Sequence, residues 1–226
     1  MKTVTFLVIL GLLCLSIDGM QYEHHLVLKS GVFDVYWTVN TSMIPNTVYF
    51  KYVAKTTGWA ALGWSKTASG GQMIQYDIAL GGVRNTNESY LKDYYSSTLG
   101  KPTYDDDVRQ NLILTSATES GGFTTIEFNR ETDTGDTGYD VPIQNGTKTW
   151  IMWGLNPKDA TDANTFAKHT EKGYTSLPYN MFTGKQFSST TAQPKTTSGS
   201  QATSVKIMLA FAAILLVQLG SVLMLH

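Results

Sequence analysis

Cysteine and charge are both scarce in this chain of 226 residues. The single cysteine, Cys14, lies in the apolar run at the N-terminus. Once that run is removed the chain has no thiol, which excludes disulfides, zinc knuckles, thiol nucleophiles and haem attached through a Cys-x-x-Cys-His motif. Only 15% of the residues are charged, and the formal net charge is -1. The sequence therefore has no basic stripe for a phosphate backbone, and we expect no nucleic-acid partner.

The motifs of common enzyme classes are also missing. The sequence contains no GxSxG elbow, no glycine-rich phosphate loop, no HExxH and no dinucleotide fingerprint. Two acidic groups, Asp105-Asp106-Asp107 and the run Asp133, Asp136 and Asp140, lack the alternate spacing of an EF-hand loop. We interpret both as solvated turns. Paired acids for glycoside hydrolysis meet in space, so the sequence alone singles out no such pair.

Both ends of the chain have the pattern of processing signals. Residues 1–19 combine a positive start, Lys2, with an apolar core over 4–15 and the small residues Ser16 and Gly19, which is typical of a secretory signal peptide. The apolar core is short for a transmembrane anchor, the alternative interpretation. We therefore expect the chain to enter the secretory pathway.

The C-terminal end favours a lipid anchor. A hydrophobic tail over residues 207–226 has no basic residue after it, as in a glycosylphosphatidylinositol signal. A serine- and threonine-rich tether over 187–206 precedes it and contains three consecutive small residues, Ser198, Gly199 and Ser200, as attachment candidates. We expect the protein at the outer leaflet of the plasma membrane. The alternative is a single-pass helix.

Residues 20–186 have the pattern of an all-β domain. Apolar residues alternate with polar ones, and glycine, asparagine, aspartate and proline interrupt the alternation about every ten residues. This rhythm predicts an antiparallel, immunoglobulin-like β-sandwich of eight or nine strands. The predicted strands cover residues 24–29, 33–40, 48–54, 59–64, 74–81, 111–117, 123–130 and 149–155. Three sequons, at Asn40, Asn87 and Asn145, are candidate glycosylation sites at the surface.

Histidine is the scarcest residue with metal-binding chemistry in the body of the chain. His24 and His25 stand at the entrance of the predicted domain, and His169 alone lies deep within it. A lone histidine is more often structural than a ligand. Met73 follows the flexible segment Ser69-Gly70-Gly71-Gln72, where a methionine is more often core filler. Neither residue alone establishes a site.

Together these residues fall into a family pattern. The pattern comprises GWAALGWS over 58–65, GGQM over 70–73, Asp77, NLIL over 111–114, FNR over 128–130, WIMWG over 150–154, and His169 before Gly173. Over about residues 22–180 the chain resembles the DOMON domain family, which includes haem-binding, proposed sugar-binding and unassigned members. In the haem-binding branch a methionine and a histidine ligate a b-type haem. The resemblance places these roles on Met73 and His169.

The resemblance implies a cell-surface b-type cytochrome that carries single electrons. A thioether and an imidazole fill both axial positions of the iron, which suits outer-sphere electron transfer rather than oxygen binding. Small reductants such as ascorbate, ferric chelates or a membrane oxidoreductase are the expected partners. We expect a carrier rather than a catalyst with its own turnover, although a reductase stays open. Five aromatic residues near the motifs either line an apolar haem pocket or belong to the core of the sandwich, namely Trp59, Trp64, Tyr76, Trp153 and Phe166.

A haem-free binding or adhesion module is the alternative function. The sequence has twelve tyrosines. Four of them stand beside polar residues and are candidate stacking platforms for carbohydrate, namely Tyr90, Tyr94, Tyr95 and Tyr104. Tyrosine is also common in sandwich strands, so this pattern does not decide between the two functions.

Overall fold

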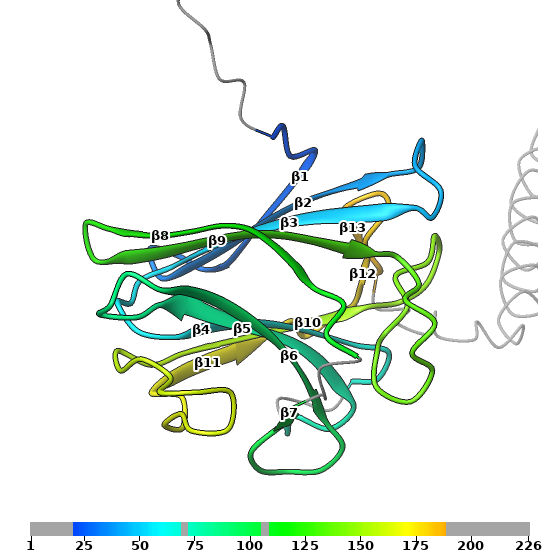
Figure 1. The fold of residues 1–226 in the computed structure, drawn as a ribbon. Helices are drawn as coiled ribbons and strands as arrows, with labels where there is room; N and C mark the ends of the chain where they lie inside the picture. Colours follow the sequence, from blue (N-terminus) through cyan, green and yellow to red (C-terminus); the bar gives the residue numbers. More distant parts are fainter. Residues whose placement is uncertain (1–19, 69–71, 105–108, 189–226) are drawn as a thin grey trace, which may run out of the picture. The chain divides into compact units, whose positions relative to one another are not determined.

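The computed structural model describes residues 20–68, 72–104 and 109–188, and these form an antiparallel β-sandwich (Figure 1). The first sheet has the order β1 (His24–Lys29), β2 (Phe33–Asn40), β3 (Thr47–Ala54), β9 (Phe123–Glu131), β8 (Ile113–Ser120). The second has the order β11 (Glu171–Tyr174), β10 (Trp150–Leu155), β4 (Ala60–Ser65), β5 (Tyr76–Val83), β6 (Ser89–Ser96), β7 (Thr103–Tyr104). A short hairpin, β12 (Tyr179–Asn180) and β13 (Lys185–Gln186), follows. The all-β sandwich prediction is confirmed.

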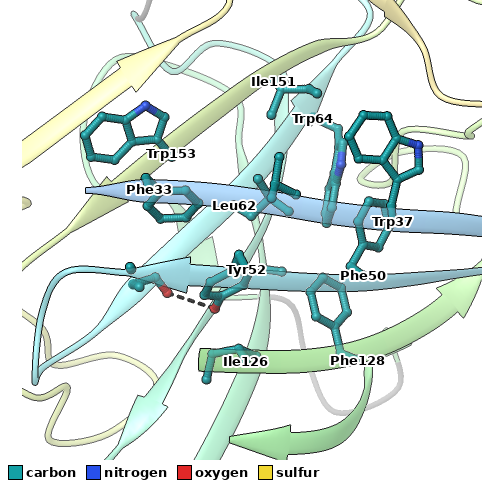
Figure 2. Close-up of a cluster of buried hydrophobic side chains, with 14 of the residues drawn as sticks. Phe33, Trp37, Phe50, Tyr52, Leu62, Trp64, Ile126, Phe128, Ile151 and Trp153 are labelled. Carbon is teal, nitrogen blue, oxygen red and sulfur yellow. Dashed lines mark hydrogen bonds between the residues drawn. The ribbon is translucent and has the colours of Figure 1, made fainter. Parts of the chain in front are cut away.

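Large aromatic side chains fill the space between the two sheets (Figure 2). Phe50 of the first sheet packs against Trp64 of the second with ring centroids 4.9 Å apart, and Phe33 packs against Trp153 at 5.2 Å. The Tyr52 hydroxyl is completely buried and donates a hydrogen bond of 3.1 Å to the Ala60 carbonyl. Aromatic burial of this kind holds the sheets together without a disulfide, because each ring removes a large apolar area from water.

The central strands of the second sheet, β4, β5 and β10, are buried on both faces, unlike the strands of the first sheet. Every residue of β4 is buried, whereas β1 alternates between half-buried and exposed positions. Alternate residues of β4, such as Leu62 and Trp64, point into the core between the sheets. Ala61 points the other way and joins a second apolar cluster with Trp59 and residues of β5, β6 and β10. A sheet with one face in water has apolar residues only on its inner face. The second apolar cluster therefore shows that the outer face of the second sheet is covered as well.

The strands predicted from alternation are present, with boundaries that differ by up to three residues. The prediction missed β6 because Lys92 and Asp93 interrupt its apolar pattern, and Asp93 is nevertheless completely buried. It also missed the short strands β7, β11, β12 and β13.

The predicted signal peptide over 1–19 lies outside the described residues, and so does the anchor region over 189–226 with Ser198, Gly199 and Ser200. Within the described part of the chain, no helix has the length and apolar character needed to cross a membrane.

Candidate functional site

A cavity of about 470 Å³ lies on the covered outer face of the second sheet. Its size falls within the range of about 300–1,000 Å³ typical of small-molecule and cofactor sites. Its lining is mostly apolar, with a few polar or charged side chains: Trp59, Ala61, Met73, Ile78, Leu80, Leu99, Gly100, Lys101, Pro102, Met152, Gly154, Phe166, Lys168, His169 and Lys172. Both residues singled out from the sequence, Met73 and His169, line this one cavity.

Met73 lies in the loop that leads into β5. Its backbone has φ +56°, in the left-handed region that a methionine rarely adopts, and Gln75 has φ +59°. The loop is held against β6, because the Ser96 hydroxyl donates to the Met73 carbonyl and the Gln75 N–H donates to the Ser96 carbonyl over 2.6 Å. The Met73 side chain packs against the outer apolar cluster. Strained backbone that neighbouring contacts hold in place is a feature of ligand-binding loops.

His169 lies in the loop between β10 and β11. Asn156 fixes this loop by donating from its side-chain amide to the Lys168 carbonyl over 2.6 Å, and Thr170 donates its N–H to the Leu155 carbonyl over 2.9 Å. The His169 side chain lies over Gly154, where an added Cβ would stand 3.5 Å from the histidine Cβ. The absence of a side chain at Gly154 leaves room above the sheet beside the imidazole.

The two loops approach the cavity from opposite ends of the sheet. The loop with Met73 enters β5 beside the end of β4, where Asp77 pairs with Trp64. The loop with His169 enters β11 beside the end of β10, where Glu171 pairs with Leu155. Leu155 in turn pairs with Ala60, at the start of β4. A thioether and an imidazole therefore reach the same cavity from opposite ends.

The surroundings of His169 favour its neutral form. Burial lowers the pKa of His169 below its ordinary value, and the positive charges of Lys172 and Lys168 lower this pKa further. A neutral imidazole has a free lone pair, which is the form that binds a metal ion.

Two aromatic rings hold the loop over the cavity. The Trp59 indole N–H donates to the Ala167 carbonyl over 3.2 Å, and the Tyr94 hydroxyl donates to the Ala163 carbonyl over 2.8 Å. Phe166 makes edge contacts with both rings, with centroids 5.8 Å from Trp59 and 5.5 Å from Tyr94. These contacts fix the loop that carries His169.

A buried ion cluster anchors β5 immediately after the Met73 loop. Arg130 of β9 is completely buried and contacts the carboxylates of Asp77 and Asp140, the latter at 3.3 Å. Asp77 also accepts a hydrogen bond of 2.9 Å from the Val141 N–H. Asp77, Asp93 and Asp140 place carboxylate oxygens within 4.8 Å of one another. The cluster therefore joins the first sheet, the second sheet and the loop around residue 140.

The profile of the DOMON domain family matches residues 29–155, which is more than half of the chain. The chain belongs to the DOMON domain family. His169 lies after the matched segment, whereas Met73, Asp77 and Arg130 lie within it.

Two known proteins resemble this DOMON domain. MOXD1 homolog 1 of Drosophila melanogaster is 26% identical over 151 residues, which cover 65% of this chain and 20% of that protein. The chain thus spans about a fifth of that relative's length. The crystal structure of the cytochrome b domain of pyranose dehydrogenase from Coprinopsis cinerea has a similar fold, with a TM-score of 0.52 and 13% sequence identity. The similarity covers 68% of this chain and 78% of that one.

The five aromatic residues near the motifs divide between the core and the cavity of the DOMON domain. Trp59 and Phe166 line the cavity, whereas Trp64 and Trp153 belong to the core between the sheets. Tyr76 is buried in the outer cluster but does not line the cavity.

The tyrosines suggested as carbohydrate platforms do not form one surface. Tyr90 and Tyr94 are buried, so that interpretation is wrong for both. Tyr95 makes an edge contact with Tyr139, and Tyr104 makes one with Tyr94. Polar residues beside these tyrosines in the sequence favour exposure. The loop over residues 156–170 nevertheless covers the outer face of the second sheet, where it contacts Tyr94 and Tyr90.

The interpretation of Asp133, Asp136 and Asp140 as a solvated turn is wrong for Asp140. Asp140 is buried because its carboxylate pairs with Arg130 and accepts hydrogen bonds from Asn111 and Thr134. Asp133 is exposed. The segment Asp105-Asp106-Asp107 lies outside the described residues.

The three sequons remain predicted glycosylation sites. Asn87 and Asn145 are exposed in turns, and Asn40 is half-buried at the end of β2.

Sequence reasoning missed four residues of the cavity that matter for its chemistry. Met152 is a second thioether in the lining, and Lys101, Lys168 and Lys172 are its charged side chains. Met152 stands in the WIMWG motif, where strand alternation places it on the face opposite Trp153. Lys168 and Lys172 flank His169, whereas Lys101 lies in the loop between β6 and β7, so no local pattern groups all three.

Proposed function

We propose that this DOMON domain binds one non-covalent haem b and carries single electrons at the cell surface. The observation that carries the proposal is the pairing of Met73 and His169 in one apolar cavity, from opposite ends of the sheet. Met73 and His169 would hold the iron of one haem placed between them, with one ligand from each loop. The fold similarity to the cytochrome b domain of pyranose dehydrogenase supports the same proposal.

The residues of the cavity fit the chemistry of haem. The neutral imidazole of His169 offers a nitrogen ligand and the thioether of Met73 a soft sulfur ligand, a combination that raises the reduction potential of iron. Trp59, Ile78 and Phe166 supply an apolar wall that excludes water. When bound, haem would supply a reversible one-electron couple. With Met73 and His169 as its two protein ligands, the haem would offer no open position to dioxygen.

The expected partners and location belong to the same proposal. The signal-peptide and anchor patterns over residues 1–19 and 187–226 support delivery to the outer face of the plasma membrane. There the domain would exchange electrons with ascorbate, ferric chelates or a membrane oxidoreductase.

A haem titration of the purified protein tests this proposal. We expect the wild type to bind one equivalent of haemin with a shift of the Soret band, and His169→Ala to lose most of that affinity because a principal ligand is gone. His25→Ala is the matched control, since His25 stacks on Tyr36 at the surface of β1 and lies away from the cavity lining. Equal titration curves for the wild type and His169→Ala would refute the ligand assignment.

A further inference from the structure

The charged side chains in the cavity lining all carry the same sign. Lys101, Lys168 and Lys172 line the cavity, and no aspartate or glutamate does so among the described residues. All three lysines are exposed, so they stand at the mouth rather than in the apolar interior. A protein with nearly balanced charge therefore presents three positive charges at one apolar opening.

The positions of the three lysines follow from separate elements. Lys172 of β11 pairs with Gly154 of β10, and cross-strand partners share a face, so Lys172 points to the cavity side. Lys168 directly precedes His169, and its carbonyl is held by Asn156. Lys101 lies in the loop between β6 and β7, with its ammonium 4.7 Å from the centre of the Phe166 ring and donating to the Asn164 carbonyl.

Ammonium groups that lie around one cavity repel one another, and a bound anion would reduce this repulsion. Lys168 and Lys172 are four residues apart in the chain and line the same cavity as His169. The ion pairs within the described residues do not include Lys101 or Lys168. An acidic ligand would compensate for this repulsion when it enters the cavity.

We propose that Lys101, Lys168 and Lys172 form a cationic collar that binds the carboxylates of an amphipathic acid whose apolar body fills the cavity. This inference rests on the proposed function, because the acid in question is haem and its carboxylates are the two propionates. The collar sets the orientation of the ligand, with the acidic edge at the mouth and the apolar edge against Ile78 and Leu80. Lysine ammonium groups suit this role because their flexible stems adapt to a carboxylate.

A comparison of haemin with its dimethyl ester tests the collar on the full-length protein. The ester keeps the iron and the apolar body but has no propionate charge. We expect the wild type to bind haemin more tightly than the ester, and Lys101→Gln, Lys168→Gln and Lys172→Gln each to weaken haemin binding by about twofold to fivefold. The same variants should bind the ester as the wild type does. Lys55→Gln, at an exposed position outside the cavity, is the matched control.

Salt dependence provides a measurement that needs no variant. Haemin affinity should fall between 50 mM and 500 mM salt, because the Debye length shortens from roughly 14 Å to about 4 Å, while ester affinity stays constant. Equal affinity for haemin and the ester at all salt concentrations, with a normal Soret shift for both, would overturn the collar and leave the proposed function standing. A complete lack of Soret shift with either compound would overturn both.

Discussion

Met73 stands in a backbone conformation that costs free energy for any residue with a side chain. Ser96 holds this conformation by donating to the Met73 carbonyl and accepting from Gln75. The cavity contains a second methionine, Met152, on a regular strand with no such strain. The strained loop distinguishes the two thioethers, since it brings Met73 in from the end of the sheet opposite His169.

Replacing each of the two methionines by leucine distinguishes an iron ligand from a residue that only lines the cavity. We expect Met73→Leu to bind haem with one axial ligand fewer, so that the sharp low-spin bands become high-spin and the reduction potential falls. Met152→Leu conserves volume and should leave the low-spin spectrum intact, at a stability cost below about 1.5 kcal/mol. Absorption spectra of the two variants check this expectation. Loss of the low-spin bands in Met152→Leu alone would reassign the sulfur ligand to Met152.

Arg130 is the other residue whose loss should be severe. Its guanidinium lies among the buried carboxylates of Asp77 and Asp140 and is completely buried. Arg130→Met should lower the free energy of unfolding by about 3–5 kcal/mol, because it leaves buried carboxylates uncompensated. Denaturant unfolding measures this loss. Lys29→Met, at the more exposed ion pair with Glu171, is the control and should cost about 1 kcal/mol or less.

At the scale of elements, the alternation of apolar and polar residues predicts where the strands lie. It does not predict which loops cover the faces of the sheets. Polar residues on one face of β1 and β2 predict a half-exposed sheet, as observed. In β4, small residues follow one another with Leu62 and Trp64 and without polar alternation, which is the pattern of a strand buried on both faces. This pattern signals the outer apolar cluster. It does not reveal that loops 97–102 and 156–170 cover the strand, because loop position depends on contacts distant in sequence.

The pairing of Met73 with His169 is another contact that local sequence patterns do not reveal. Their pairing was inferred from a family resemblance, since no local spacing connects residues from two loops at opposite ends of a sheet. The buried cluster of Asp77, Asp140 and Arg130 was missed for a related reason. A charged residue in the sequence is normally solvated, and only the packed structure places Arg130 where two carboxylates meet.

Gly58 lies directly against the segment that leads to the loop with His169. A Cβ at Gly58 would stand 2.4 Å from the Asn156 carbonyl oxygen and 2.5 Å from the Pro157 carbonyl carbon. Gly58→Ala should therefore displace the segment that holds Lys168 and His169, with a stability loss of about 1–3 kcal/mol and weaker haem binding. Gly138→Ala, where nothing lies within 4 Å, is the matched control. Haem titration and thermal unfolding of both variants measure the effect.

At the scale of the whole molecule, the buried carboxylates make stability depend on pH. Burial raises the pKa of Asp77 to about 6, against the opposing attraction of Arg130, and the neighbouring charge of Asp140 raises it further. The native state thus binds a proton more tightly than the unfolded chain, in which the pKa is about 3.9. The stabilising contribution of Asp77 is fully present below pH 4 and is lost as the pH rises through 6.

Asp77→Asn isolates this contribution. The difference in unfolding free energy between the wild type and Asp77→Asn should decrease from pH 4 to pH 6, by at most about 1.4 kcal/mol per pH unit, and be constant above pH 7. Asp133→Asn, which removes an exposed carboxylate outside the ion cluster, serves as the control. Denaturant unfolding at several pH values provides the data. A difference that grows with pH would mean that Arg130, rather than burial, dominates the titration of Asp77.

The absorption spectrum of the purified protein, loaded with haem and recorded oxidised and then reduced by ascorbate, tests the central claim most directly. We predict sharp low-spin bands in both states, a reversible change on reduction, and loss of those bands in the variants Met73→Leu and His169→Ala. A folded protein that stays colourless after titration with haem would contradict the account.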